Sequence, residues 1–179
     1  NVASSFFSAK FQRSIEELLV SPTANITVLF GYVAGGVARG ILVGLVVTLV
    51  SLFFSKLEIY NLTVLFSVTI LTSVLFALGG FTNALLAKKF DDISIIPTFV
   101  LTPFTYLGGV FYSIKLLPEF WQTVSHFNPV LYMINAFRYG FLGISDIPLL
   151  SSYLIILAFI VVLFMLNLHL INRGYGLRA

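Results

Sequence analysis

The chain has no cysteine among its 179 residues, and only 9% of its residues are charged. The absence of cysteine excludes disulfide bonds, thiolate catalysis and metal sites with sulfur ligands. The sequence also has no nucleophile beside a base, no phosphate-binding glycine loop and no cluster of metal ligands, so we expect neither catalytic nor metal-binding residues. What it has instead is 59% hydrophobic residues and a mean hydropathy of +1.03, which are typical of a chain that lies in a membrane.

Four long apolar stretches occupy most of the chain. The hydrocarbon core of a bilayer is roughly 30 Å thick and needs about 20 apolar residues in a helix. The first stretch carries one charge, Arg39, and the other three carry none. We therefore predict an all-α, polytopic membrane protein. Its four transmembrane helices are predicted at residues 26–54, 60–87, 93–113 and 148–172.

The segments outside these stretches are too short to fold separately, so the prediction is one membrane domain over residues 1–179. The sequence has no initiator methionine and no recognisable signal peptide, and it begins in the middle of a pattern. We expect it to be an N-terminally truncated fragment of a longer protein.

Basic residues divide unequally between the two sides of the predicted membrane. Six lie on one side: Lys10, Arg13, Lys88, Lys89, Arg173 and Arg178. Three lie on the other: Lys56, Lys115 and Arg138. The positive-inside rule therefore places both chain ends in the cytoplasm. The basic residues flank the spans, so we interpret the net charge of +3 as a contribution to the orientation of the chain among membrane lipids. We therefore expect no nucleic-acid partner.

The outer segment 114–147 is longer and more aromatic than the other connections. Its two apolar pieces, residues 119–127 and Val130–Leu142, are too short to cross a bilayer. Pro129 suits the first turn of the second piece, since proline needs no backbone donor there, and Gly143 is placed to end it. We predict a helical hairpin that re-enters the outer leaflet.

Residues 1–22 are predicted to form a cytoplasmic amphipathic arm. Within Ser8–Pro22, apolar residues repeat at helical spacing and charged residues fill the opposite face. Such a helix either lies on lipid or binds a protein in the cytoplasm. Glu16 and Glu17 favour a protein partner, because anionic lipid would repel them.

The first span is rich in glycine. Its glycines fall on two stripes at four-residue steps. Gly36, Gly40 and Gly44 form one stripe, and Gly31 and Gly35 form the other, which continues to Arg39. Glycines at this spacing allow helices to pack closely in lipid, within the subunit or across a dimer. A charge inside a span is costly unless it is paired, so Arg39 has two interpretations. It is either a functional residue that faces protein or water, or a structural arginine that reaches toward the interface or caps carbonyl groups.

The third span contains Pro97 and Pro103 and ends in the pair Gly108–Gly109. Prolines bend a membrane helix by freeing backbone carbonyls, so this helix is either mobile or pore-lining, or is bent merely for packing. Just before it, Asp91 and Asp92 are predicted to cap the helix N-terminus, where the helix dipole favours negative charge, and not to bind metal.

One set of residues in the outer half repeats a known pattern: Pro103–Tyr112, Leu117–Pro118, Asn128–Pro129, Tyr132, Arg138 and Gly143. This pattern resembles the signature of the ABC-2 family of transport permeases. The cytoplasmic run Ile15–Pro22 is similar to the segment that precedes the third span of that family. The resemblance extends along the whole chain.

The resemblance implies a six-span protein of which this chain holds the last four spans. It implies that the arm docks on a separate cytoplasmic ATPase through the coupling residues Arg13, Glu16, Glu17 and Leu18. It also implies an outer gate that contains Gly108, Gly109, Pro129, Tyr132 and Arg138. Two permease copies and two ATPases would form an exporter in the bacterial inner membrane. ATP and Mg²⁺ would then bind the partner subunit, and this chain would bind no cofactor.

The first hypothesis is therefore the permease subunit of an ATP-binding cassette exporter. The alternatives are an ion-coupled secondary carrier, and a membrane scaffold or assembly protein. Acidic residues are absent from all four predicted spans, which counts against proton coupling.

Overall fold

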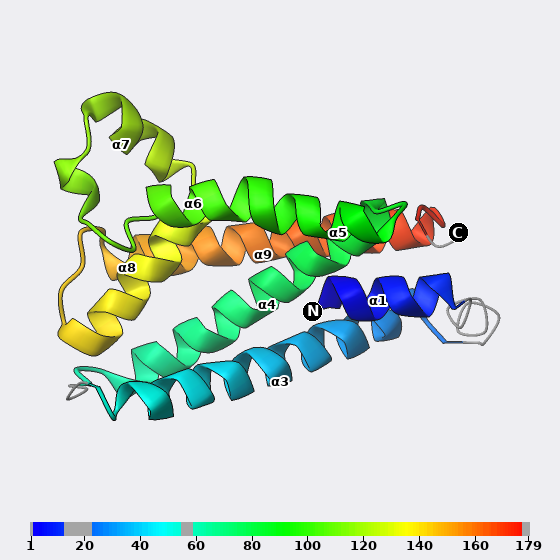
Figure 1. Cartoon of the computed structure of the whole chain (residues 1–179), viewed down its shortest axis with the longest axis horizontal. Helices are drawn as coiled ribbons and strands as arrows, with labels where there is room; N and C mark the ends of the chain where they lie inside the picture. Colours follow the sequence, from blue (N-terminus) through cyan, green and yellow to red (C-terminus); the bar gives the residue numbers. More distant parts are fainter. Residues whose placement is uncertain (1, 13–22, 55–58, 177–179) are drawn as a thin grey trace.

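The computed structural model describes residues 2–12, 23–54 and 59–176, and every regular element in these ranges is a helix (Figure 1). The elements are α1 (Val2–Phe11), α3 (Asn25–Ser51), α4 (Leu62–Leu86), α5 (Phe90–Ile96), the π-helix η1 (Pro97–Leu101), α6 (Thr102–Leu107), the 3₁₀ helix η2 (Ile114–Leu116), α7 (Glu119–His126), α8 (Pro129–Leu142) and α9 (Leu149–Asn172). The prediction of an all-α chain is confirmed for this part of the sequence.

Three uninterrupted helices are long and apolar enough to cross a bilayer. They are α3 with 27 residues, α4 with 25 and α9 with 24. Asn61 starts α4 by accepting a hydrogen bond from the backbone N–H of Val64 at 3.1 Å, and Pro148 directly precedes α9. The predicted spans 26–54, 60–87 and 148–172 agree with these helices to within three residues.

The predicted span 93–113 differs, because the structure divides it. The chain passes from α5 through η1 into α6 and leaves the helix at Gly108. Pro97 and Pro103 have no backbone N–H to donate to the preceding turn. Between them the backbone hydrogen-bond pattern changes from that of an α-helix to that of a π-helix, which is η1. The described residues thus contain three uninterrupted spans and one interrupted helical run, where the sequence alone predicted four transmembrane helices.

The helices alternate in direction, so their ends gather at two poles (Figure 1). The start of α3, the connection from α4 to α5 and the end of α9 lie at one pole, whereas α7 and α8 lie at the other. Lys88, Lys89 and Arg173 follow the helices that end at the first pole. Lys10 lies there too, since its ammonium donates a hydrogen bond to the Ala87 carbonyl at 3.1 Å. This layout places on one side the ends that the charge distribution assigned to one side. That this side faces the cytoplasm stays a prediction of the positive-inside rule, and the two poles are called cytoplasmic and outer after that prediction.

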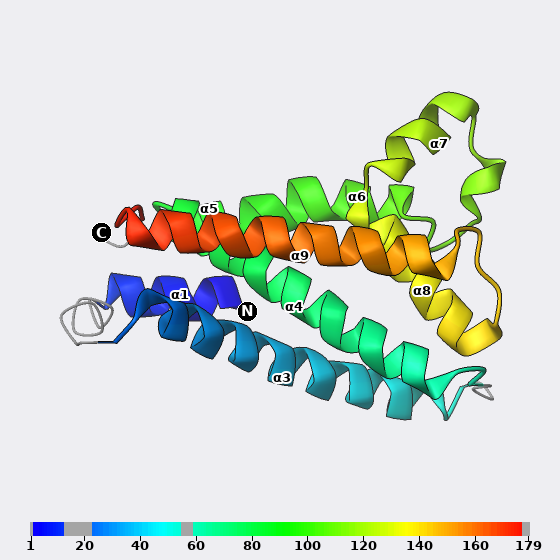
Figure 2. The ribbon, with the colours of Figure 1, turned by 180° about the vertical axis from the view of Figure 1, so that it is seen from behind.

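Helix α1 departs from the prediction of one cytoplasmic arm over residues 1–22. It lies beside the first half of α3 and contacts α3, α4 and α5 (Figure 2). Its apolar residues Val2, Phe6 and Phe7 are buried, because their helical spacing places them on one face. The charged part of the predicted amphipathic helix, residues 13–22, is outside the described residues.

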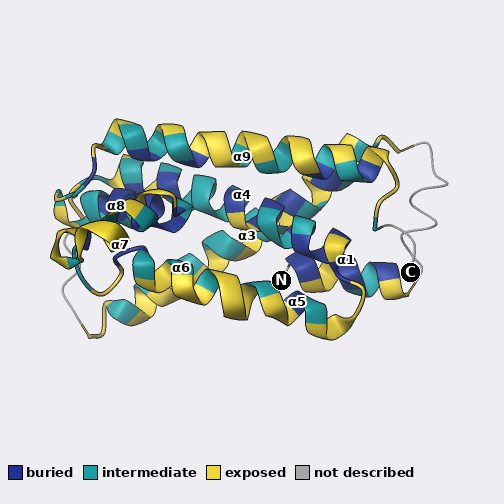
Figure 3. Ribbon diagram, turned by 90° about the horizontal axis from the view of Figure 1, so that it is seen from above, coloured by how far each residue is buried: buried dark blue, intermediate teal, exposed yellow. Residues whose placement is uncertain are grey.

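Two apolar clusters hold the helices together. In the first, the rings of Phe6 and Phe81 lie 4.4 Å apart between centroids, and Tyr32 packs on both. The second joins α4, α8 and α9 around Leu131 and Ile156, which are fully buried. The outward faces remain exposed, most clearly along α9 (Figure 3). Exposed apolar faces on spanning helices are those that contact lipid.

Polar side chains add a second link between α4 and α9. The Asn167 amide donates to the Leu78 carbonyl at 3.0 Å, and the Thr82 hydroxyl donates to the Asn167 side-chain oxygen at 2.9 Å. Ser67 and Tyr153 share a hydrogen bond nearer the outer pole. Such bonds between membrane helices fix their register, because an unpaired polar group in hydrocarbon is costly.

Candidate functional site

The outer pole contains a connected polar network centred on Arg138 of α8. Its guanidinium donates to the Gly109 carbonyl at 2.7 Å and forms an ion pair with Asp146 at 2.9 Å. The Asp146 carboxylate also accepts from the Ser113 hydroxyl at 2.9 Å and lies 3.4 Å from the Lys115 ammonium. The network ties the segment after α6 to α8 and to the loop before α9.

Asp146 stays ionised in this network. Burial by itself would raise its pKa, since only 13% of the side chain is exposed. Hydrogen bonds from Ser113 and Lys115, with the charges of Lys115 and Arg138, outweigh burial and lower the pKa below the ordinary aspartate value. The carboxylate is therefore a fixed negative charge at neutral pH.

The glycine pair after α6 is required by this geometry. Gly109 has a φ of 77°, a left-handed conformation that favours glycine. At Gly108, a Cβ atom would lie 2.8 Å from Ile134 of α8 and 2.9 Å from the Phe104 carbonyl. The pair thus ends α6 and lets its last turn touch α8.

Asn128 makes a second connection between α6 and α8. Its amide donates to the Phe104 carbonyl at 2.6 Å, and its side-chain oxygen accepts from the Val130 N–H at 3.0 Å. It therefore caps α8, with Pro129 in the first turn, and holds the last turn of α6. The hydroxyl of Tyr132 donates to the His126 carbonyl at 2.8 Å, which links α8 to α7.

Of the five residues assigned to the outer gate, the structure joins Arg138 to Gly109 by a hydrogen bond and places Gly108 against α8, the helix that contains Pro129, Tyr132 and Arg138. Their role as a gate stays a prediction. Sequence reasoning missed Asp146, the carboxylate that pairs with Arg138. The one available signal was its position, eight residues after Arg138 and just before the last span. Asn128 was part of the recognised pattern, but its bond to α6 needed the structure.

The glycines of α3 differ in what surrounds them. A Cβ at Gly36 would lie 2.5 Å from Val2 and 2.8 Å from Ala77, and one at Gly40 would lie 2.6 Å from the Ser73 hydroxyl. Gly44 has nothing within 4 Å among the described residues. Close packing against α1 and α4 therefore involves the first two glycines of the predicted stripe and not the third.

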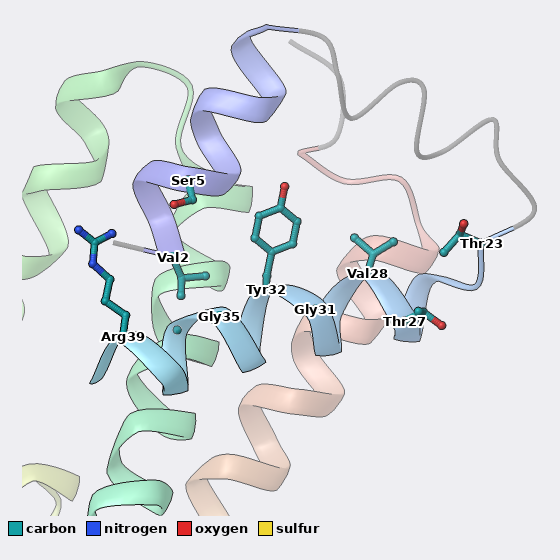
Figure 4. A pocket seen from close by; sticks show the side chains of 10 residues that line it. Val2, Ser5, Thr23, Thr27, Val28, Gly31, Tyr32, Gly35 and Arg39 are labelled. Atoms are coloured by element: carbon teal, nitrogen blue, oxygen red, sulfur yellow. The ribbon is translucent and has the colours of Figure 1, made fainter. Parts of the chain in front are cut away.

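Arg39 projects from α3 toward the side on which α1 lies (Figure 4). It lines a cavity of about 520 Å³ between these two helices. Its side chain makes no hydrogen bond or ion pair with any residue that the structure describes. Two of the possibilities offered by the sequence, a contact with a protein group and the capping of carbonyl groups, find no partner in these residues. The other two, facing water and reaching toward the interface, stay predictions.

At the cytoplasmic pole, the predicted cap of α5 is confirmed for one of the two aspartates, Asp92. The Asp92 carboxylate accepts from the backbone N–H groups of Lys88 and Lys89 at 2.8 and 2.9 Å. In residues 2–12, 23–54 and 59–176, no group of three His, Asp or Glu side chains is placed to hold a metal. The predicted coupling residues all lie outside these ranges: Arg13, Glu16, Glu17 and Leu18.

Comparison with known proteins gives consistent matches. The family model for the ABC-2 type transporter matches residues 1–142. The inner membrane transport permease YadH of Escherichia coli K12 is 56% identical over all 179 residues, which correspond to 70% of that protein. Nodulation protein J of Rhizobium leguminosarum bv. trifolii is 24% identical over 162 residues, or 90% of this chain and 62% of that protein. No solved structure gives a significant match.

Proposed function

Because this chain belongs to the ABC-2 type transporter family, we propose that it is the permease subunit of an exporter driven by ATP hydrolysis on a separate subunit. Membership makes it a multi-pass inner-membrane transport permease. One observation carries the proposal of an exporter with an outer gate. The residues that define the family pattern, Gly108–Gly109, Asn128 and Arg138, are joined by hydrogen bonds and contacts into one outer assembly.

In this proposal α5, η1 and α6 together form one membrane-spanning segment, the third in chain order, which corresponds to the predicted span 93–113. Phe90–Leu107 is continuous in helical winding and extends roughly 27 Å at 1.5 Å per residue, close to the bilayer core. Helices α7 and α8 have 8 and 14 residues, too few to span, and form the outer re-entrant hairpin. The network around Arg138 connects this hairpin to the outer end of the segment formed by α5, η1 and α6.

The proposed ATPase contact is the segment with Arg13, Glu16, Glu17 and Leu18. Its neighbours in sequence, the end of α1 and the start of α3, both lie at the cytoplasmic pole. An ATPase there would bind ATP and Mg²⁺, whereas the permease would supply the path. Binding of ATP would favour one of two permease conformations, as alternating access requires.

A second copy of the permease is the proposed partner within the membrane. The middle of the segment formed by α5, η1 and α6 supports the proposal, because the described elements that η1 mainly packs against are α5 and α6, its neighbours in sequence. Phe99 and Val100 in this segment are exposed. Lipid and a second subunit are the surroundings that suit such an apolar face.

The test is co-purification of the full-length permease with the ATPase encoded beside its gene. The double substitution Glu16→Lys with Glu17→Lys should release the ATPase, because two reversed charges oppose docking. Glu119→Lys is the matched control, since this residue begins α7 at the opposite pole, and it should retain the ATPase.

Three results would contradict the proposal. If the double variant keeps a stoichiometric ATPase, the coupling assignment is wrong. If the wild-type permease purifies without an ATPase and an ion gradient drives its transport of solute, it is a secondary carrier. If it purifies alone and moves no solute, the scaffold hypothesis gains support.

A further inference from the structure

Lys10 is a buried lysine near the end of α1 that lies at the cytoplasmic pole. Only 7% of the residue is exposed. Its ammonium donates a hydrogen bond to the Ala87 carbonyl at 3.1 Å and lies 5.6 Å from the centre of the Phe7 ring. Lysine is rarely buried, because the ammonium group loses its hydration. The Ala87 carbonyl and the Phe7 ring replace part of that hydration.

The group that Lys10 binds is the end of a spanning helix. Ala87 directly follows α4 as its C-cap residue. Carbonyl groups at a helix C-terminus have no partner within the helix and form the negative end of the helix dipole, so a cation is favourable there. This cation comes from α1 and not from α4 itself, so the bond ties the two helices together.

The connection from α4 to α5 is itself fixed by hydrogen bonds. We call residues 83–93 the α4–α5 corner. Within it, the Asp92 carboxylate accepts from two backbone N–H groups of the turn, and the Asn83 amide donates to the Ile93 carbonyl at 2.9 Å. Because these bonds join the end of α4 to the start of α5, a force on the corner acts on both helices.

Aromatic contacts join α1 to the same corner. The ring of Phe90, the first residue of α5, lies edge-on to the ring of Phe7 with 5.1 Å between centroids, and 6.5 Å from the ring of Phe11. Lys10 and Phe11 follow Phe7 by three and four positions, so the three side chains lie near one face of α1. Helices α1 and α5 accordingly lie side by side (Figure 3).

We propose that Lys10 is a positioning residue that couples the ATPase to the α4–α5 corner, an inference that rests on the proposed function. Arg13, the first of the proposed ATPase contacts, follows Lys10 by three positions. Movement of the bound ATPase therefore acts on the end of α1 that holds Ala87. From the corner, α5 leads through η1 and α6 to Gly109, whose carbonyl binds Arg138. Packed side chains and hydrogen bonds between rigid elements are the means by which such coupling travels.

The experiment measures amide hydrogen exchange in the full-length permease bound to its ATPase. The response is the difference in exchange of α5 between the nucleotide-free complex and the complex trapped with ATP and vanadate. Wild type should show a response, because the corner moves with α1. Lys10→Met keeps the length of the side chain but removes its charge, so the response should disappear while the ATPase stays bound. Lys10→Arg keeps a cation that can donate and should keep the response.

Two further variants separate coupling from general effects. Lys88→Met is the matched control, since it removes the same charge from an exposed side chain next to Ala87 and should keep the wild-type response. Phe90→Leu weakens the aromatic contact with α1 and leaves Lys10 in place, so it should reduce the response. This variant decides the question if Lys10→Met fails to fold.

A merely structural role for Lys10 gives a different result. Loss of a hydrogen bond to a charged group should raise the exchange of α5 about tenfold with and without nucleotide, and the difference between the two states would persist. A persistent response in Lys10→Met, or in Phe90→Leu where the first variant does not fold, overturns the proposal. So does a wild-type complex without a response, a Lys88→Met complex that loses it, or release of the ATPase by Lys10→Met.

The same samples distinguish this inference from the proposed function. Co-purification of the ATPase is scored before exchange is measured. A wild-type permease that purifies without an ATPase contradicts the proposed function, and the coupling role of Lys10 falls with it. A bound ATPase without a response in α5 contradicts the coupling role alone.

Discussion

The side-chain amide of Asn83 in α4 donates a hydrogen bond to the backbone carbonyl of Ile93 in α5 at 2.9 Å. In a regular α-helix this carbonyl would accept from the N–H of residue 97, which is a proline and has none. Asn83 is only 4% exposed, so the bond forms away from solvent. A side chain of the neighbouring span thus replaces the donor that Pro97 removes, as membrane helices with proline require.

This relationship predicts coupling between Asn83 and Pro97. Asn83→Leu should lower the free energy of unfolding by about 1–3 kcal/mol, because the Ile93 carbonyl is left without a donor. In a Pro97→Ala background the backbone supplies that donor, so the same substitution should cost less. Unfolding by dodecyl sulfate, measured for both single variants and the double variant, gives the coupling energy. Equal costs in the two backgrounds would show that the bond does not compensate for Pro97.

The outer network predicts a pH dependence through Asp146. Asp146→Asn should lower the melting temperature at pH 7, because Arg138 and Lys115 lose an ionised partner. The pKa of Asp146 is lowered in the folded protein, so its contribution is present above the unfolded value near 3.8 and disappears as the pH falls through the folded value. The difference between wild type and variant should therefore be constant above about pH 5 and vanish below the folded pKa. A difference that grows in acid would contradict this account.

The contacts of α3 predict a contrast between two glycines. Gly40→Leu should destabilise the protein by about 1–3 kcal/mol, because its side chain meets Ser73 of α4. Gly44→Leu adds the same side chain where nothing lies within 4 Å among the described residues, and should change stability by less than about 0.5 kcal/mol. Thermal unfolding in detergent compares them. A large effect at both positions would mean that Gly44 also packs, against a second subunit or against residues outside the described ranges.

The polar link between α4 and α9 predicts a moderate loss at Asn167. Asn167→Leu removes its bonds to Leu78 and Thr82 from a site that is fully buried, and should cost about 0.5–2 kcal/mol. Met165→Leu, on the exposed face of the same helix, is the control and should be neutral. Equal stability of the Asn167 variant and the control would show that apolar packing alone fixes the register.

Hydrophobic length and proline position were enough to predict five of the helices, namely α3, α4, α7, α8 and α9. Spans appear in the sequence because lipid requires about 20 consecutive apolar residues, and short apolar pieces after proline predicted α7 and α8. The interruption of the third predicted span followed from Pro97 and Pro103, although its π geometry did not. Helix α1 was not recognised as part of the bundle, because ten residues with one buried face give no span signal.

The sequence by itself determined the class of the protein and the order of its spanning helices, and it predicts their direction across the membrane. Each of these follows from local composition and from the distribution of Lys and Arg. Only the tertiary structure decided the partners: Asn83 with Ile93, Arg138 with Asp146, and an Arg39 without a partner among the described residues. Side chains that are distant in sequence meet only when packing places their helices side by side, and a single sequence carries no record of which polar groups are paired there.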